Sequence, residues 1–380
     1  MRTDPQIGDG SLPATLMFMP RTNLKGRGTV WAIEHRFTSQ HHESIDEGWG
    51  TLEQAAREEA VAPATQIIEQ RVKTILSGND SPDIAFDLSI NPYRGCEHGC
   101  IYCFARPTHS YLNLSPGLDF ETKIIAKVNA AERLREAFAA RNYEPLPLNI
   151  GSATDAYQPA ERRLGITRSL IDVLSEHRHP FSIITKSSGI ERDIDLLGPL
   201  ARSNLVAVYV SIPTLDPALA RVMEPRATAP ERRLRTIERL AQAGIPVGVS
   251  VSPVIPFLNE PELERVLERA RDAGARTAFA TVLRLPWEVN PLFQQWLQAH
   301  FPERAARVMA RVRDLRGGRD NDSRFGQRMS GQGVWAQLLA QRLEKSSQRL
   351  GLSRERVALD FSQFRRPVAQ PAPLAQQSLF

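Results

Sequence analysis

The three cysteines of this 380-residue chain all lie within one short segment, Cys96-Glu-His-Gly-Cys100-Ile-Tyr-Cys103. An odd, clustered set provides no disulfide framework, and no fourth cysteine exists to complete a four-cysteine zinc site. Three thiolates on one tight loop can bind three irons of a cubane [4Fe–4S] cluster and leave the fourth iron free for an exogenous group. A zinc site completed by His98 or His109 is the alternative. Under both interpretations this segment carries the chemistry.

Short apolar runs alternate with amphipathic segments from about residue 83 onward. The runs predict six strands, at Phe86–Ile90, Leu146–Ser152, Phe181–Thr185, Leu205–Ile212, Pro246–Ser252 and Thr277–Leu283. The segments between them have helical spacing, which predicts parallel strands joined by right-handed crossovers. Six strands favour an α/β fold with a partial (β/α)6 barrel over a full eight-stranded one. The cysteine segment follows the first strand, at the end of the sheet where ligands gather in such folds.

The whole sequence predicts four regions. We expect an N-terminal extension over residues 1–82, with a helix at about Leu52–Leu76, and a core over residues 83–301. A basic helical region over residues 302–365 and a flexible tail rich in Pro, Ala and Gln over residues 366–380 follow. The N-terminus lacks the pattern of a secretory signal, and no run of about 18 apolar residues occurs, so we expect a cytoplasmic protein without a transmembrane helix.

Net charge is +5, and its distribution is uneven. Residues 303–380 carry fifteen Lys/Arg and seven Asp/Glu, so the other 302 residues sum to −3. A basic region on a near-neutral body indicates either an acidic partner such as nucleic acid or a solvated helical face. Residues 308–333 combine glycines and Phe325 with six arginines, which predicts a nucleic-acid groove, although frequent Arg and Ala also fit a GC-rich coding bias. The arginines are Arg311, Arg313, Arg316, Arg319, Arg324 and Arg328.

The CxxxCxxC spacing, with Tyr102 before the third cysteine, resembles the signature of the radical S-adenosylmethionine (SAM) superfamily. The wider stretch from Asn91 to His109 is similar to the branch related to spore photoproduct lyase, a DNA-repair enzyme, and the resemblance covers roughly Ser89 to His300. It implies a radical SAM barrel in which the three cysteines bind a [4Fe–4S] cluster and the open iron binds SAM. One electron then cleaves SAM to methionine and a 5′-deoxyadenosyl radical, which abstracts hydrogen from substrate.

The resemblance also implies residues that contact SAM. The usual Gly-Gly-Glu is absent after the second predicted strand, so polar residues of Gly151–Pro159 are expected to take its place. A lysine at the end of the third strand is expected at the SAM carboxylate, and a serine on the fourth at the ribose. The expected contacts are Tyr102, Ser152, Thr154, Asp155, Lys186 and Ser211. Three of them have a structural alternative: Asp155 as a helix cap, Lys186 as a surface residue and Ser211 as a small residue in a packed strand.

Two features concern the chemistry after hydrogen abstraction. Photoproduct lyase returns a hydrogen atom from a cysteine beside its SAM-binding serine, whereas Ile150-Gly-Ser-Ala153 contains none, which argues against photoproduct repair by that route. Tyr102 and Tyr157 could donate hydrogen, although packing is the more ordinary role. No catalytic residue is assigned. The block Met223-Glu-Pro-Arg226 also matches the related family, and we interpret Glu224 and Arg226 as a structural ion pair.

The last five residues, Gln376-Gln-Ser-Leu-Phe380, resemble the pentapeptide by which bacterial replication and repair proteins bind the DNA sliding clamp. Gln376, Leu379 and Phe380 would make the contact, with the Pro-rich tail as tether. The resemblance further implies a reductase, flavodoxin or ferredoxin as electron donor. We therefore expect an oxygen-sensitive radical SAM enzyme acting on DNA, RNA or a nucleotide. The alternatives are a radical SAM enzyme acting on a peptide or small molecule, and a nucleic-acid-binding adaptor with a structural iron–sulfur cluster.

Overall fold

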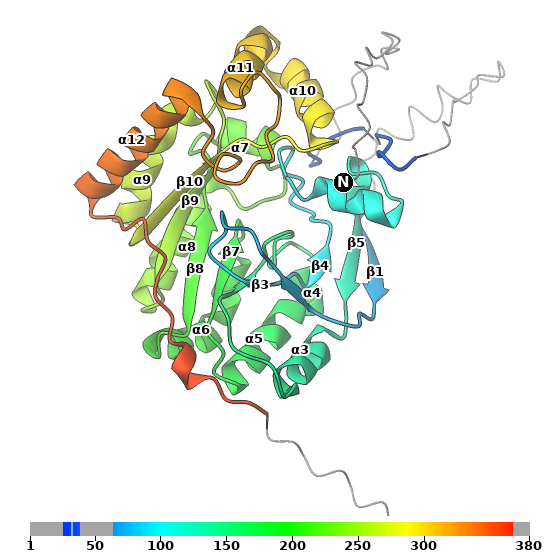
Figure 1. Ribbon diagram of the computed structural model, residues 1–380, viewed down its shortest axis with the longest axis vertical. Helices are drawn as coiled ribbons and strands as arrows, with labels where there is room; N and C mark the ends of the chain where they lie inside the picture. Colours follow the sequence, from blue (N-terminus) through cyan, green and yellow to red (C-terminus); the bar gives the residue numbers. More distant parts are fainter. Residues whose placement is uncertain (1–25, 32, 39–63, 368–380) are drawn as a thin grey trace, which may run out of the picture.

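The computed structural model describes residues 26–31, 33–38 and 64–367 of the chain. Its centre is a curved sheet with the strand order β10-β9-β8-β7-β6-β3-β2 (Figure 1). Six neighbouring strands run parallel: β3 (Leu88–Ile90), β6 (Leu148–Ile150), β7 (Phe181–Thr185), β8 (Val206–Ser211), β9 (Val247–Val254) and β10 (Thr277–Val282). They coincide with the six predicted runs, so the α/β class and the partial (β/α)6 barrel are confirmed.

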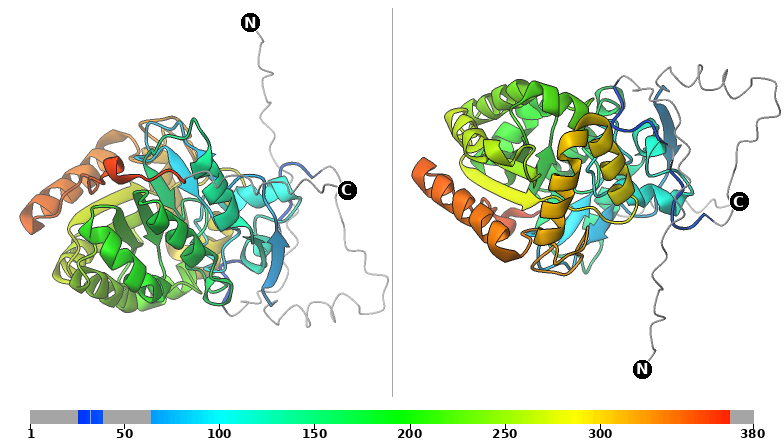
Figure 2. Two further views of the ribbon diagram at one scale, coloured as in Figure 1. Left: turned by 90° about the horizontal axis from the view of Figure 1, so that it is seen from below. Right: turned by 90° about the horizontal axis from the view of Figure 1, so that it is seen from above.

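Helices between the strands surround the sheet (Figure 2). They are α3 (Ala130–Ala139), α5 (Ile166–Glu176), α6 (Ile194–Arg202), α8 (Pro230–Gln242) and α9 (Leu263–Asp272). Each buries one apolar stripe, and in α9 the stripe is Leu263, Val266, Leu267 and Ala270. Strand β8 is buried along its whole length, as expected for a strand covered on both faces.

A second, smaller sheet has the strand order β1-β5-β4. It contains β1 (Gln66–Gln70), β4 (Tyr93–Arg94) and β5 (Lys123–Lys127), while β2 (Leu76–Gly78) pairs antiparallel with β3. The predicted helix at Leu52–Leu76 is therefore wrong over residues 64–76, and its first part lies outside the described residues. Ile67 and Ile68 pair in parallel with β5, and their β-branched side chains suit this sheet better than a helix.

Three longer helices follow β10: α10 (Val289–His300), α11 (Pro302–Leu315) and α12 (Gly333–Leu350). The chain then runs along the amino-terminal ends of the barrel strands, where Asp360 N donates to Asn204 O (2.9 Å) and Arg365 N to His177 O (2.8 Å). Most of the predicted tail, including Gln376–Phe380, lies outside the described residues.

The remaining helices are short. They are η1 (Arg106–Leu112), α2 (Leu118–Thr122), α4 (Glu161–Leu164), η2 (Ser188–Asp193), α7 (Pro217–Met223), η3 (Glu260–Glu262) and η4 (Phe361–Gln363). Among the described residues, no helix combines the length and apolar character needed to cross a membrane.

Candidate functional site

The cysteine loop begins directly after β4. Cys96 and Cys100 are buried, Cys103 is partly exposed, and all three are free thiols. Gly95 and Gly99 both have left-handed backbone conformations, with φ of +80° and +66°. A Cβ on Gly99 would lie 2.6 Å from a carboxylate oxygen of Glu121, so the loop requires glycine there for space as well as for conformation.

The donor set of this loop fits a multi-iron cluster better than a single ion. In the described part of the chain no three His, Cys, Asp or Glu side chains converge on one metal position. A single zinc ion requires such convergence, whereas cysteines that bind separate irons of a cubane do not. Of the two candidate fourth zinc ligands, His98 Nδ1 lies 3.3 Å from Asp155 Oδ2, and His109 Nε2 lies 3.1 Å from Lys123 O while its Nδ1 is buried without a hydrogen-bond partner among the described residues.

A buried ion pair between Arg106 and Glu121 stabilises the cysteine loop. The Arg106 guanidinium donates to Cys100 O (3.0 Å) and Gly99 O (3.2 Å), and it pairs with Glu121 at 2.5 Å. Burial raises the pKa of Glu121, and the Arg106 charge opposes that rise. The pair holds the loop backbone in place through the carbonyl groups on either side of Cys100. Sequence analysis missed it, since only the fold shows that two charged residues fifteen positions apart are fully buried together.

An N-terminal segment, residues 26–31 and 33–38, lies against the cysteine loop, and we call it the strap (Figure 1). Gly28 N donates to Glu121 Oε2 at 2.8 Å. A Cβ on Gly28 would lie 1.7 Å from Gly99 O, so the two glycine backbones are in direct contact. Farther along, Arg36 pairs with Glu288 at 2.9 Å, which ties the strap to the loop after β10.

Two predicted SAM contacts follow β6 and bind the protein itself. Thr154 Oγ1 donates to Gly95 O (2.7 Å) and accepts from Gln158 Nε2 (3.1 Å). The Ser152 hydroxyl accepts from Asn91 Nδ2 at 3.1 Å. Thr154 thus anchors the start of the cysteine loop.

Asp155 connects three parts of the site. Its carboxylate accepts from Thr185 Oγ1 and Lys186 N, both at 2.7 Å, and it faces His98 of the cysteine loop. Although burial alone raises the pKa of Asp155, the His98 ring and these hydrogen bonds hold it well below its ordinary value. Asp155 does not cap the helix that follows, because α4 begins after Ala160. It therefore ties the loop to the end of β7.

Lys186 and Ser211 carry polar groups without protein partners. Lys186 Nζ lies 5.9 Å from the centroid of the Tyr102 ring, and within the described residues it makes no hydrogen bond or ion pair. Burial alone lowers the pKa of Lys186, but neighbouring Cys100 and Glu224 outweigh that effect and raise it. The Ser211 hydroxyl, at the end of β8 beside β7, likewise bonds to no described residue. The predicted SAM contacts at Lys186 and Ser211 therefore each have a polar group that no described side chain or backbone group binds.

The predicted ion pair between Glu224 and Arg226 is wrong. Glu224 instead accepts a hydrogen bond from the Tyr102 hydroxyl and pairs with Arg233, and all three side chains are buried. Arg226 pairs with Glu97 at 3.1 Å. Residues two apart just beyond a helix end point in different directions, so their adjacency in sequence does not bring them together.

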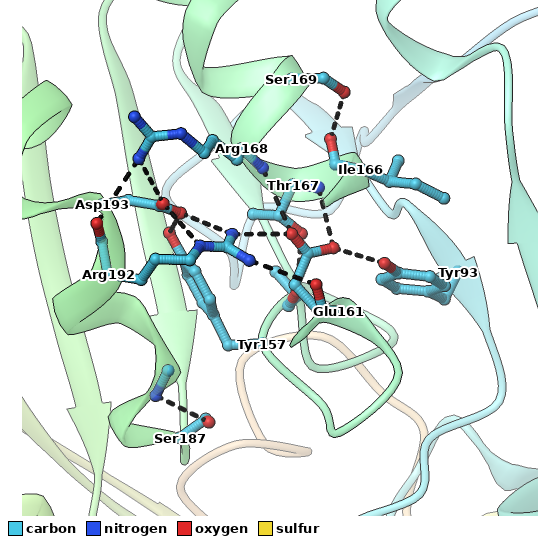
Figure 3. A network of polar contacts seen from close by, with 12 residues as sticks. Tyr93, Tyr157, Glu161, Ile166, Thr167, Arg168, Ser169, Ser187, Arg192 and Asp193 are labelled. Carbon is cyan, nitrogen blue, oxygen red and sulfur yellow. Dashed lines mark hydrogen bonds and ion pairs between the residues drawn. The ribbon is translucent and has the colours of Figure 1, made fainter. Parts of the chain in front are cut away.

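Tyr157 belongs to a polar network beside the site (Figure 3). Its hydroxyl donates to Asp193 Oδ2 at 3.0 Å, and Asp193 is also bound by Arg168 and Arg192. Arg192 extends the network to Glu161 at 2.8 Å. The Tyr157 hydroxyl is therefore held between buried and half-buried charges.

Most arginines of residues 308–333 bind groups of their own chain. Arg316 is buried and donates to Leu283 O (2.5 Å) and Gln327 O (3.0 Å). Four others pair with acidic residues: Arg311 with Asp314, Arg313 with Asp320, Arg324 with Asp322, and Arg328 with Asp83. This region accordingly presents less unpaired positive charge than its composition indicates.

Exposed aromatic rings gather on the segments next to the cysteine loop, a feature that sequence analysis missed. We call them the aromatic rim: Phe37, Phe104, Tyr111 and Trp287, with exposed fractions of 53%, 49%, 68% and 64%. The Arg36 guanidinium lies 4.4 Å from the Trp287 centroid and 5.1 Å from that of Tyr111. Ser110 also donates to Glu288 at 3.3 Å, so the segment after the cysteines and the loop after β10 lie side by side.

Comparison with known sequences agrees with a cysteine loop that binds an iron–sulfur cluster. The model of the radical SAM superfamily matches residues 90–270. An uncharacterized protein of Mycobacterium tuberculosis is 36% identical over 234 residues, which cover 61% of this chain and 68% of that protein. An uncharacterized protein of Methanocaldococcus jannaschii is 24% identical over 238 residues, covering 63% of this chain and 85% of that protein.

Among solved structures, the fold is similar to spore photoproduct lyase. A variant of that enzyme with bound AdoMet and dinucleoside spore photoproduct has a TM-score of 0.54 and 14% identity, covering 75% of this chain and 80% of that chain. A second variant has a TM-score of 0.55 and covers 80% and 92%, respectively. The chain therefore belongs to the radical SAM superfamily and is an enzyme of that class, whose cofactors are a [4Fe–4S] cluster and SAM.

Proposed function

We propose that this enzyme abstracts a hydrogen atom from a nucleic-acid substrate in the cytoplasm. When bound, the cluster and SAM supply the 5′-deoxyadenosyl radical. Cys96, Cys100 and Cys103 hold the cluster, Lys186 binds the SAM carboxylate, and Ser211 binds the ribose. The unpartnered ammonium and hydroxyl groups support the last two assignments.

The other site residues orient the cysteine loop. Thr154 and Asp155 fix one side of it through Gly95 O and His98. Glu224 fixes the other side by accepting from Tyr102 while it is paired with Arg233. Thr154, Glu224 and Arg233 are buried, so these contacts hold the cysteine loop in one geometry.

The aromatic rim is the observation that carries the nucleic-acid assignment. Its rings are exposed, and Phe104 directly follows Cys103. Stacking of an unpaired base on an exposed ring stabilises binding by about 1–3 kcal/mol, and arginine adds to it. The bound dinucleoside photoproduct in spore photoproduct lyase gives further support.

A peptide or small-molecule substrate is the second candidate. It is favoured by the intrachain pairing of the arginines in residues 308–333, which leaves less positive charge for a phosphate backbone. Trp, Tyr and Arg are also frequent in protein interfaces.

The test is an assay of 5′-deoxyadenosine by anaerobically reconstituted protein. The protein receives SAM and dithionite, with single-stranded DNA, duplex DNA, RNA or no addition. We expect stimulation by a nucleic acid, loss of that stimulation in Trp287→Ala, and unchanged unstimulated turnover in that variant. Equal product with and without every nucleic acid would favour the second candidate, and no product despite about four irons per chain would favour the adaptor.

We further propose a sliding-clamp contact through Gln376, Leu379 and Phe380, with reduced flavodoxin or ferredoxin as electron donor. The clamp proposal rests on the terminal pentapeptide alone. Binding of the full chain to a bacterial clamp should be lost in Phe380→Ala and kept in Gln370→Ala, outside the pentapeptide. Equal binding by both variants would remove this proposal.

A further inference from the structure

Arg284 lies beside the cysteine loop. It is the second residue after β10 ends, and its guanidinium carbon lies 5.5 Å from the centroid of the Phe104 ring. Phe104 directly follows Cys103 and is 49% exposed. Arg284 is thus placed at the carboxyl end of the barrel, next to an accessible ring and the site of radical chemistry.

The Arg284 guanidinium has no anionic partner among the described residues. Its one side-chain hydrogen-bond contact is weak, from Nη1 to Met329 Sδ at 3.8 Å, and its buried Nε has no acceptor. The other arginines near the site differ: Arg106 and Arg233 pair with buried glutamates, and Arg316 donates to two carbonyls. A half-buried cation without a partner is costly, and a ligand anion would compensate it.

The surroundings of Arg284 carry charges of both signs, since nearby Arg328 is paired with Asp83. Burial lowers the pKa of Arg284, and nearby Arg328 lowers it further although Asp83 opposes this. Burial and the Arg284 charge together lower the pKa of Arg316 to about 10. An anion at this position is therefore favoured by the missing partner of the Arg284 guanidinium itself among the described residues.

We propose that Arg284 binds a backbone phosphate of a single-stranded nucleic acid while a neighbouring base stacks on Phe104. The inference rests on the proposed nucleic-acid function and names the residues that receive the strand. Guanidinium groups bind phosphate oxygens in a bidentate manner, and one nucleotide supplies both a phosphate and a base.

The experiment uses the reconstituted full chain and two fluorescent thymidine decamers, one with the ordinary phosphodiester backbone and one with an uncharged methylphosphonate backbone. Fluorescence anisotropy over a salt series gives the affinity and its salt dependence. For the charged decamer, Arg284→Met should weaken binding about tenfold. The slope of log K against log salt should shrink by about 0.7.

Two matched variants make the result specific. Arg141→Met removes the same charge from an exposed turn before β6, at the opposite end of the barrel, and should change neither probe. Phe104→Ala should weaken both decamers, since stacking does not require the backbone charge. Arg284→Lys should recover part of the affinity for the charged decamer. The brown cluster absorbance of each variant checks that the site is assembled.

The outcomes separate this inference from the proposed function. If the wild-type protein binds the charged decamer and Arg284→Met matches Arg141→Met, the phosphate assignment is overturned and the nucleic-acid function stands. If the wild-type protein binds neither decamer but binds pyrophosphate in a manner lost in Arg284→Met, the nucleic-acid function fails and Arg284 remains an anion-binding residue. If it binds none of these probes, both proposals fail.

Discussion

Gly28 and Gly99 meet backbone to backbone, and this contact joins the strap to the cysteine loop. In Gly28→Ala the new methyl would occupy the position of Gly99 O, so the strap must move away. We expect a loss of about 1–3 kcal/mol in the free energy of unfolding and less iron retained per chain. Thermal unfolding and iron analysis measure these effects. Gly78→Ala is the control because a Cβ there meets nothing within 4 Å; equal behaviour of the two variants would show that the contact is dispensable.

Glu224 provides a second test at the level of single residues. Glu224→Gln leaves the buried Arg233 charge uncompensated, which should cost about 3–5 kcal/mol, whereas Tyr102→Phe should cost about 1–3 kcal/mol. Chemical denaturation measures both. If Glu224→Gln costs no more than Tyr102→Phe, the ion pair does not stabilise the loop.

His179 makes folding stability depend on pH. Burial lowers its pKa to about 4, and the ring stacks on Phe138 with centroids 4.9 Å apart. The unfolded side chain binds a proton near pH 6.5, so its contribution is complete above that pH and is lost as the pH falls toward 4. Between pH 6.5 and pH 5 the loss is roughly 2 kcal/mol. Urea unfolding at both pH values measures this loss in the wild-type protein and in His179→Gln, which lacks the contribution of this ring. An equal loss of stability in the two proteins would disprove the assignment.

At the level of elements, sequence predicted the parts whose structure is set locally. Strands β7 and β8 are almost entirely buried and correspondingly apolar, and that pattern is visible without the fold. Strand β1 was missed because its structure depends on pairing with β5, which lies more than fifty residues later. The strap was missed for the same reason, because the sequence around Gly28 does not indicate that this residue contacts Gly99.

The functional site shows the same difference between features set locally and features set by the fold. The cluster-binding loop was predicted because the spacing of its cysteines is a local feature of the sequence. The resemblance identified Lys186 and Ser211 at strand ends, where the structure leaves their polar groups without protein partners. The Arg106–Glu121 pair, the partner of Glu224 and the isolation of Arg284 depend on residues that meet only in the folded chain.

Removal of iron should affect separate elements together, because the strap and the cysteine loop share Glu121. After chelation we expect faster amide hydrogen exchange in residues 95–103 and in residues 26–31, with little change in α5. Mass spectrometry of the exchanged protein measures this. Faster exchange confined to the cysteine loop would show that the strap is seated independently of the cluster.

On the scale of the whole molecule, positive charge in the sequence is a poor guide to positive charge at the surface. The C-terminal helices supply many arginines, but α12 uses Arg342 to bind Glu264 at 2.7 Å and Glu260, which fastens it to α9. In the loop between α11 and α12, Asp320 and Asp322 likewise pair with Arg313 and Arg324. Composition predicted a basic helical region, whereas many of its arginines are bound within the chain and Arg284 lies beside the cysteine loop without an ion pair to any described residue.

The path of residues 351–367 along the amino-terminal ends of the strands has a practical consequence. The last described residues leave the barrel at the end opposite the cysteine loop, next to His177 and Asn204. An attachment to a sensor chip made at the last described residues would hold the protein from that side, with the aromatic rim facing the flowing solution. An attachment through the strap would instead place the chip surface against the rim.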